Sequence, residues 1–170
     1  MPICDQTEKT ITFLGLSICV KTHSHSDVFS FDQMLDMRGN TAAYLIYQLT
    51  RIRSVGRKVA GRVSTEEVHK TAKEAKFTFD HPRELKLAKT IVKLHEVLHQ
   101  AQRDLLIHPL CEWMYTLSNV FSQFYNECYI IEAKDGVEQI HVSRLILAEA
   151  TARVMEAAFK ILGIRTLHKM

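Results

Sequence analysis

The sequence has few of the residues that interrupt regular structure. Its 170 residues include only three prolines and six glycines, too few for a disordered or turn-dominated chain. Its longest apolar run, residues 11–20, is about half of the roughly 20 residues that a membrane helix needs, so we expect no membrane partner. The run also lacks a purely basic leader and an Ala-x-Ala site, so a secretory signal is not expected. With 46% hydrophobic residues, the chain can bury the core of one domain.

The sequence also lacks the close pairs of cysteines that hold metal ions or form a disulfide framework. Its four cysteines are widely spaced, at Cys4, Cys19, Cys111 and Cys128, without a Cys-x-x-Cys pair. The last two fall among apolar residues, which predicts reduced cysteines in the core. Two histidine pairs have spacings that could suit a metal: His23/His25 and His95/His99. Because neither pair has a third ligand in view, we expect no metal site.

Charge is modest overall and uneven along the chain. The formal net charge is +3, but residues 38–76 hold nine Lys or Arg against three Asp or Glu. That segment therefore carries an excess of six positive charges, and the remainder is net −3. Such a basic segment can form the electrostatic footprint of RNA. Ordinary solvated helix faces are the alternative interpretation.

The most informative stretch is residues 40–59, which we expect to form one long helix. Asn40 is a suitable N-cap, and only Gly56 weakens the helix over the next twenty positions. At 100° per residue, the face expected to join the core comprises Ala42, Leu45, Leu49, Ile52 and Val59. A second face carries Tyr44, Tyr47, Arg51, Ser54 and Lys58. Aromatic and cationic side chains can stack on bases and neutralise phosphates, although such a stripe can equally pack against another helix or face water.

Further helices are expected on both sides of a single exposed loop. A capping box, Ser64 with Glu67, opens a short helix to about residue 76. Pro82 and Pro109 each mark a helix start. For the first of these, a helix of some twenty residues, the expected core face is Leu85, Ala88, Val92, His95 and Leu98.

The helix after Pro109 has a strong apolar seam, with Trp113 and Tyr115 off it. Its members are Leu110, Met114, Leu117, Phe121, Phe124 and Cys128. Residues 132–139, with Asp135-Gly136, read as a turn in a long exposed loop. A last helix over residues 142–162 stops at Gly163. The sum predicts an all-α bundle of about five helices.

Residues 31–54 closely resemble the segment of arginyl-tRNA synthetases that joins the catalytic domain to the helical anticodon-binding domain. The residues that carry the resemblance are Phe31, Asp32, Met34, Leu35, Gly39, Asn40, Thr41, Ala42, Tyr44, Leu45, Tyr47, Thr50, Arg51, Arg53 and Ser54. Residues 108–130 resemble the helix before that family's variable loop, and residues 143–164 resemble its final helix. The resemblance implies an anticodon-binding domain over residues 28–170, preceded by an unmatched leader, residues 1–27. It also implies a cytoplasmic protein.

The resemblance assigns the candidate site residues. Tyr44 and Tyr47 match the tyrosines of the family's Asn-Thr-x-x-Tyr-x-x-Tyr motif, Tyr125 matches the tyrosine before the variable loop, and Met170 matches the terminal methionine. It implies that these residues lie against the anticodon loop of an arginine tRNA. Arg51 and Arg53 match the motif's arginines, one of which is expected to contact phosphate or hold the fold. Departures from the family pattern are Ala43, Ile46, Asn126, His168 and Lys169.

No part of the sequence resembles the catalytic half of those enzymes. The His-x-Gly-His and Lys-Met-Ser-Lys types of sequence are missing, and so is a glycine-rich phosphate loop. We therefore expect no catalytic residues, no cofactor in this chain (ATP serves the full-length family), and no aminoacylation by the chain alone. A catalytic domain or a multi-synthetase assembly is a further expected partner. The alternatives are a non-catalytic module that docks on protein, and an inactive fragment.

Overall fold

The described part of the molecule is a bundle of α-helices with one small β-hairpin at its end. A computed structural model describes residues 42–59, 79–134 and 137–166. Its helices are α3 (Ala42–Val59), α5 (Pro82–Val92), α6 (Leu94–Asp104), α7 (His108–Glu127) and α8 (Val142–Ile161), and its strands are β1 (Ile131–Lys134) and β2 (Val137–Ile140). The predicted helical bundle is therefore confirmed. The expected helix at 64–76 and the leader at 1–27 lie outside the described residues.

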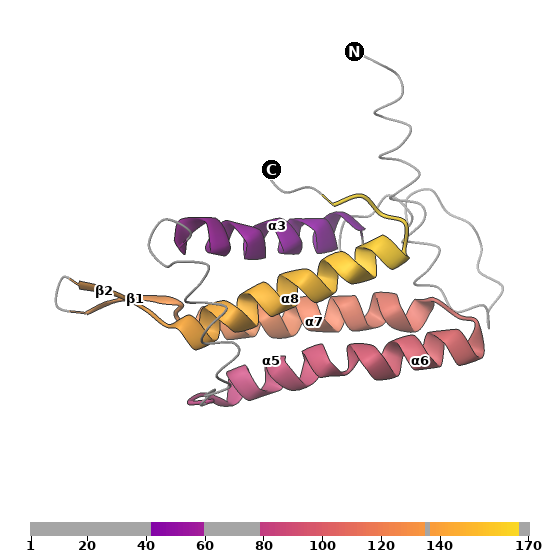
Figure 1. The fold of residues 1–170 in the computed structure, drawn as a ribbon, viewed down its shortest axis with the longest axis horizontal. Helices are drawn as coiled ribbons and strands as arrows, with labels where there is room; N and C mark the ends of the chain where they lie inside the picture. The colour runs from indigo at the N-terminus through magenta and orange to yellow at the C-terminus, as the bar shows by residue number, and fades with distance from the viewer. Residues whose placement is uncertain (1–41, 60–78, 135–136, 167–170) are drawn as a thin grey trace, which may run out of the picture.

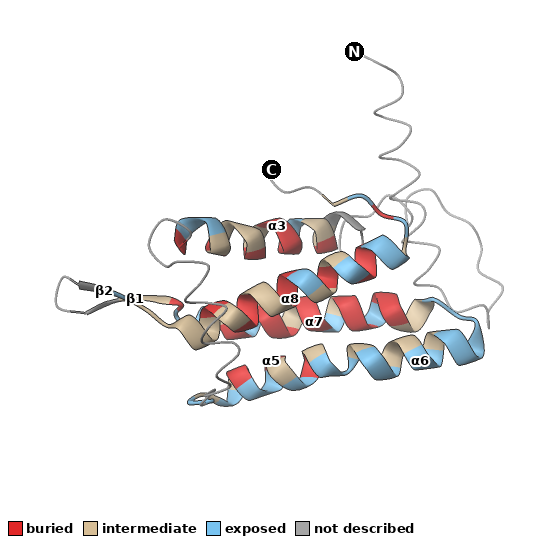
Figure 2. Cartoon of the chain, in the orientation of Figure 1, coloured by how far each residue is buried: buried red, intermediate tan, exposed pale blue. Residues whose placement is uncertain are grey.

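The helices form layers around α7 and α8. In Figure 1, α7 and α8 lie in the middle, α3 lies on one side of them, and α5 and α6 follow the other side. The predicted apolar seam of α7 is confirmed, since all six of its residues are buried. Figure 2 shows the buried residues concentrated where α3, α7 and α8 face one another, whereas α6 is exposed over most of its length.

The predicted twenty-residue helix is divided in two, and its predicted core face is wrong at three of five positions; Ala88 and Leu98 do pack against the core. Lys93 separates α5 from α6, and the side of α5 that faces the core carries Glu84, Leu87 and Thr90. Leu85 is 40% exposed and Val92 is 74% exposed. His95 on α6 is also exposed. Apolar residues occupy neighbouring positions on this helix, so two faces fit the helical period and only packing against α7 selects between them.

Trp113 is buried although it lies off the predicted seam. Its indole Nε1 donates to the carbonyl oxygen of Thr90 at 2.9 Å. Thr90 lies in the last turn of α5, where helix carbonyls need partners from outside the helix. Trp113 therefore joins α7 to the end of α5.

The long exposed loop that the sequence predicted over residues 132–139 is wrong for its described residues. Strands β1 and β2 pair antiparallel, from Ile131↔Ile140 to Lys134↔Val137. Asp-Gly between two short strands is a strong hairpin signal, but the strands are only four residues long. At the base of the hairpin the His141 amide donates to the carbonyl of Ile130 at 2.9 Å.

The C-terminal end of α8 is a complete glycine cap, as predicted. Gly163 has φ +69°, the left-handed conformation that glycine adopts at little steric cost. The amide of Ile164 donates to the Phe159 carbonyl at 2.9 Å, and the amide of Gly163 donates to the Lys160 carbonyl at 3.2 Å. This pair of bonds defines a Schellman motif. Across the described residues, none of the helices is long and apolar enough to cross a membrane.

Candidate nucleic-acid interface

Helix α3 presents two chemically different faces. Leu45, Leu49, Ile52 and Val59 of the predicted core face are buried, together with Val55. The helix contains four cationic residues and no acidic residue. Two of these cations, Arg57 and Lys58, are exposed, and the other two are half-buried. The net charge of the helix is therefore positive at its exposed face.

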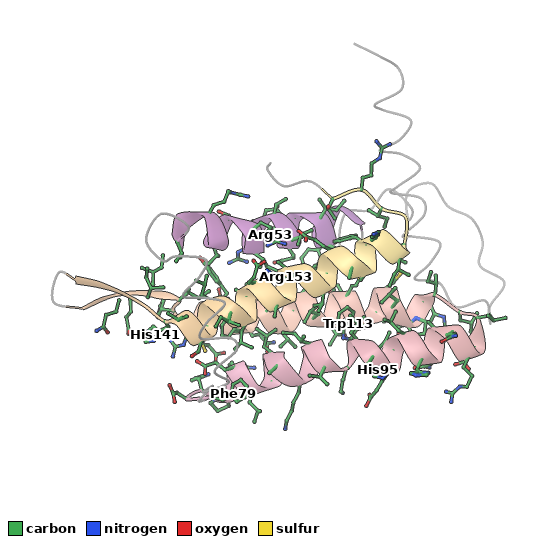
Figure 3. The ribbon with its side chains drawn as sticks, in the orientation of Figure 1. Arg53, Phe79, His95, Trp113, His141 and Arg153 are labelled. Carbon is green, nitrogen blue, oxygen red and sulfur yellow. The ribbon has the colours of Figure 1, made fainter. Side chains whose placement is uncertain are left out.

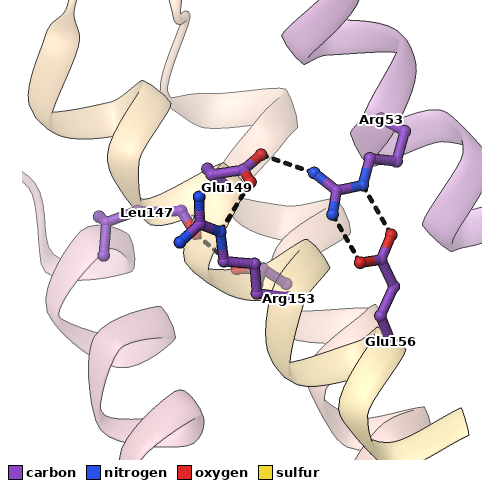
Figure 4. Close-up of polar contacts among 6 residues, drawn as sticks. Arg53, Leu147, Glu149, Arg153 and Glu156 are labelled. Carbon is purple, nitrogen blue, oxygen red and sulfur yellow. Dashed lines mark hydrogen bonds and ion pairs between the residues drawn. The ribbon is translucent and has the colours of Figure 1, made fainter. Parts of the chain in front are cut away.

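The two arginines of the α3 motif lie in different surroundings. Arg53 donates from Nε and Nη2 to Glu156 at 2.8 and 2.7 Å, and from Nη1 to Glu149 at 2.7 Å. These contacts tie α3 to α8, as Figure 4 shows; Figure 3 shows Arg53 on α3 and Arg153 on the neighbouring α8. Arg53 thus holds the fold.

Arg51 faces the C-terminal part of α7 instead. Its guanidinium carbon lies over the ring of Tyr125, 5.0 Å from the ring centroid. The ring of Phe121 is stacked beside Tyr125, at 6.1 Å between centroids and 23° between planes. A cation over an aromatic ring is attracted by the ring quadrupole. The result is a short row of planar groups that begins in the core at Phe121 and ends at the half-buried Arg51.

The two tyrosines of α3 also differ in their surroundings. Tyr44 is partly buried, its hydroxyl donates to Asn119 Oδ1 at 3.0 Å, and its ring lies 5.7 Å from the ring of Tyr115. Tyr47, one turn before Arg51, is 52% exposed. Tyr47 therefore offers the larger free surface, and Tyr44 is also part of the α3–α7 packing. Met170 lies outside the described residues.

A groove adjoins Tyr125 between α3 and the end of α7. Its volume is about 470 Å³, and it is lined by Val55, Lys58, Tyr125, Asn126, Tyr129, Ile130 and Ile131. Tyr129 is 62% exposed, and it was not among the site residues predicted from the sequence. Tyr129 follows Tyr125 by four residues, a spacing that places two side chains on the same face of a helix. Because α7 ends at Glu127, this spacing could not predict where the Tyr129 side chain lies.

The histidine pair on α6 lies apart from this surface, and the His23/His25 pair lies outside the described residues. His95 and His99 lie on the exposed side of α6 with ring centroids 5.0 Å apart. Among the described residues there is no group of three His, Cys, Asp or Glu side chains that could hold a metal ion. Cys111 and Cys128 are buried and form no disulfide, and burial raises the pKa of the Cys128 thiol.

Comparison with known proteins shows to which family the domain belongs. The family described as "DALR anticodon binding domain" matches residues 45–170. The chain is 47% identical over 146 residues to the cytoplasmic arginine–tRNA ligase of Xenopus tropicalis, covering 84% of this chain and 22% of that protein. It is 41% identical over 177 aligned positions to the cytoplasmic arginine–tRNA ligase of Cricetulus griseus, covering 96% and 26%.

A solved structure extends the similarity to three dimensions. The arginyl-tRNA synthetase of Plasmodium falciparum superposes with a TM-score of 0.75 and 29% identity, over 99% of this chain and 28% of that protein. The chain thus spans about a quarter of the length of the relatives it matches. The chain belongs to the DALR anticodon-binding domain family, and its relatives in that family are arginyl-tRNA synthetases.

Proposed function

We propose that the surface formed by α3 and the end of α7 binds the anticodon arm of an arginine-accepting tRNA. The observation that carries the proposal is the meeting of Arg51 with Tyr125, beside a groove lined by Lys58 and Tyr129. Stacking groups next to cations are what a protein needs to hold unpaired bases and their phosphates. The family to which the chain belongs supports the same function.

Arg51 has a more specific role in this proposal than phosphate contact. Its guanidinium lies over the ring of Tyr125, so it adds a planar cation to the row of aromatic rings. Bases splayed out of an RNA loop stack on guanidinium planes as well as on aromatic rings. A base that stacks on Tyr125 in the groove therefore lies close to the Arg51 cation, and Tyr47 adds an exposed ring on the same helix as Arg51.

The remainder of the function follows from the family. We propose that the chain contributes tRNA binding to arginyl-tRNA formation when a catalytic domain is joined to it, and that it is inactive in aminoacylation alone. We further propose that RNA binding needs no cofactor. A cytoplasmic site of action is consistent with the relatives, which are named cytoplasmic.

The test is binding of the purified chain to arginine tRNA and to a non-cognate tRNA, at low and at physiological salt. Tyr47→Ala and Tyr125→Ala should each weaken cognate binding by roughly 1–3 kcal/mol, the contribution of one stacked base. Arg103→Ala is the matched control for the Arg51 variants described below. Arg103 lies on α6, away from the proposed surface, and its side chain is 78% exposed. Circular dichroism checks that each variant is folded, and addition of EDTA or ATP tests the absence of a cofactor.

Two substitutions of Arg51 separate stacking from charge. Arg51→Lys keeps the positive charge but removes the plane, so we expect weaker binding with an unchanged salt dependence. Arg51→Ala should weaken binding further and reduce the slope of log affinity against log salt by about 0.7, the value for one phosphate contact on a single strand. Equal binding of both tRNAs by the wild type and by every variant would contradict the proposal.

Docking on a protein is the second candidate function, and one observation favours it. Leu105, Leu106 and Ile107, between α6 and α7, are 88%, 36% and 39% exposed. Consecutive exposed apolar residues are typical of contact surfaces when they form a patch. If an arginyl-tRNA synthetase catalytic domain binds the chain here, Leu105→Asp should abolish that complex and leave tRNA binding unchanged, as measured by sedimentation of the mixed proteins.

A further inference from the structure

We propose that Glu84 and Arg144 are positioning residues for the groove, because together they hold the backbone of Tyr129 in place. This inference rests on the proposed RNA-binding function of the groove. Neither side chain lines the groove. Their effect would be exerted through Tyr129, whose exposed ring forms part of its wall.

Glu84 is a buried carboxylate at the start of α5. It is 3% exposed, and its Oε2 accepts from the amide of Asp80 at 3.0 Å, next to the helix N-terminus that favours a negative charge. Its Oε1 accepts from Nε of Arg144 at 2.7 Å. A buried carboxylate is costly unless it is paired and hydrogen-bonded, and here both of its oxygens are bonded.

Arg144 carries this anchorage from α5 to the groove. It lies in the first turn of α8, and its side chain is 19% exposed. While Nε binds Glu84, Nη1 donates to the carbonyl oxygen of Tyr129 at 2.8 Å. Tyr129 lies between the end of α7 and the start of β1, where neither a helix nor a strand fixes the backbone. The planar guanidinium makes both contacts with a fixed angle between them.

A second arginine holds the same end of α7 from α5. Arg83 bonds to Glu127 at 2.9 and 2.8 Å and to Gln123 at 2.7 Å. Arg83 thereby fixes the last turn of the helix, whereas Arg144 fixes the residue beyond it. The orientation of the Tyr129 ring relative to Tyr125 therefore depends on Arg144 rather than on α7 alone.

The experiment compares two substitutions of Arg144 with a control substitution that removes the same kind of hydrogen bond at a place away from the groove. Arg144→Lys retains a cation for Glu84 but cannot reproduce the two-pronged contact. Arg144→Gln combined with Glu84→Gln removes the bond to Tyr129 without leaving a buried charge. Trp113→Phe is the control, because it also deletes one side-chain bond to a backbone carbonyl, at Thr90, away from the groove.

Two readouts are needed: hydrogen exchange of residues 128–131 in the free protein, and affinity for arginine tRNA. We expect both Arg144 variants to increase exchange at these amides at least fivefold and to lower tRNA affinity at least fivefold, without changing its salt dependence. Trp113→Phe should change neither.

Unchanged exchange at residues 128–131 in the folded double variant would overturn the positioning role, whatever the RNA result. Increased exchange with unchanged tRNA affinity would show that the position of Tyr129 does not matter for tRNA binding, and would overturn that part of the proposal. If the wild type fails to bind tRNA, the proposed function fails, and hydrogen exchange still decides whether Arg144 positions Tyr129.

Discussion

Two arginines that stand two residues apart in the α3 motif have separate physical roles. Arg53 makes three short hydrogen bonds to two carboxylates of α8, whereas the guanidinium of Arg51 lies over Tyr125. Because the positions differ by about 200° around the helix, one side chain turns toward α8 and the other toward α7. Each substitution therefore tests a different property of the protein.

Arg53→Ala should lower the free energy of unfolding by about 1–3 kcal/mol, because it removes partly buried, charge-assisted hydrogen bonds. Urea unfolding measures the change. Arg153→Ala is the matched control, because Arg153 contacts the same Glu149 at 2.9 Å but is 62% exposed. An exposed helical pair of this kind contributes about 0.5 kcal/mol or less. Equal losses in the two variants would contradict the role assigned to Arg53.

The same network predicts how stability depends on pH. Burial tends to raise the pKa of Glu149, but hydrogen bonds from Arg153 and Arg53 lower the pKa below its ordinary value of 4.5. A carboxylate with a lowered pKa stabilises the fold above the unfolded-state pKa, and this contribution is lost as pH falls through the folded-state pKa. The wild type should therefore lose more stability than Glu149→Gln between pH 7 and pH 3.5 in urea titrations. A parallel loss in both proteins would disprove this contribution.

At the scale of single elements, the ends of helices are encoded more clearly than their faces. Pro82 and Pro109 start helices and Gly163 ends one, each by a local conformational preference. The core face of α5 was predicted only in part and the division at Lys93 was missed, since both depend on contacts with α7. The hairpin was also missed, because four-residue strands carry little periodicity.

Two glycine substitutions test this local encoding. Gly163→Ala should destabilise the protein by about 1 kcal/mol, because φ +69° is strained for any residue with a Cβ. Gly56→Ala should stabilise it by about 0.5–1 kcal/mol, because Gly56 lies inside α3 and an added Cβ meets nothing within 4 Å. Thermal unfolding should show a lower melting temperature for Gly163→Ala and a higher one for Gly56→Ala than for the wild type. A gain in stability for Gly163→Ala would refute the cap.

At the scale of the whole molecule, one core joins all five described helices except α6, which contributes only partly buried residues. Its largest fully buried side chains come from α3, α5, α7 and α8, including Leu45, Leu87, Phe121 and Phe159. A core shared by four helices predicts that they unfold together. The groove and the Arg144 contacts should then be lost in the same transition.

Phe159→Ala should lower the unfolding free energy by about 3–5 kcal/mol, because it leaves a cavity in the core. Val92→Ala, on the exposed side of α5, should change it by less than about 0.5 kcal/mol. Fluorescence of Trp113, the only tryptophan in the chain, and circular dichroism should report the same midpoint for each protein. Separate midpoints would indicate that the bundle is not one cooperative unit.

The sequence by itself determined the helical class, the seam of α7, the proline starts of α5 and α7, the glycine cap of α8 and the family, because these depend on local preference, period or a long motif. It also indicated a cationic, aromatic surface on α3. Only the tertiary structure decided that Arg53 binds α8 while Arg51 lies over Tyr125, that Tyr129 joins the groove, and that Glu84 and Arg144 hold it. Those contacts join residues 15 to 103 positions apart, and such distant contacts are determined by the packing of the helices rather than by the local sequence.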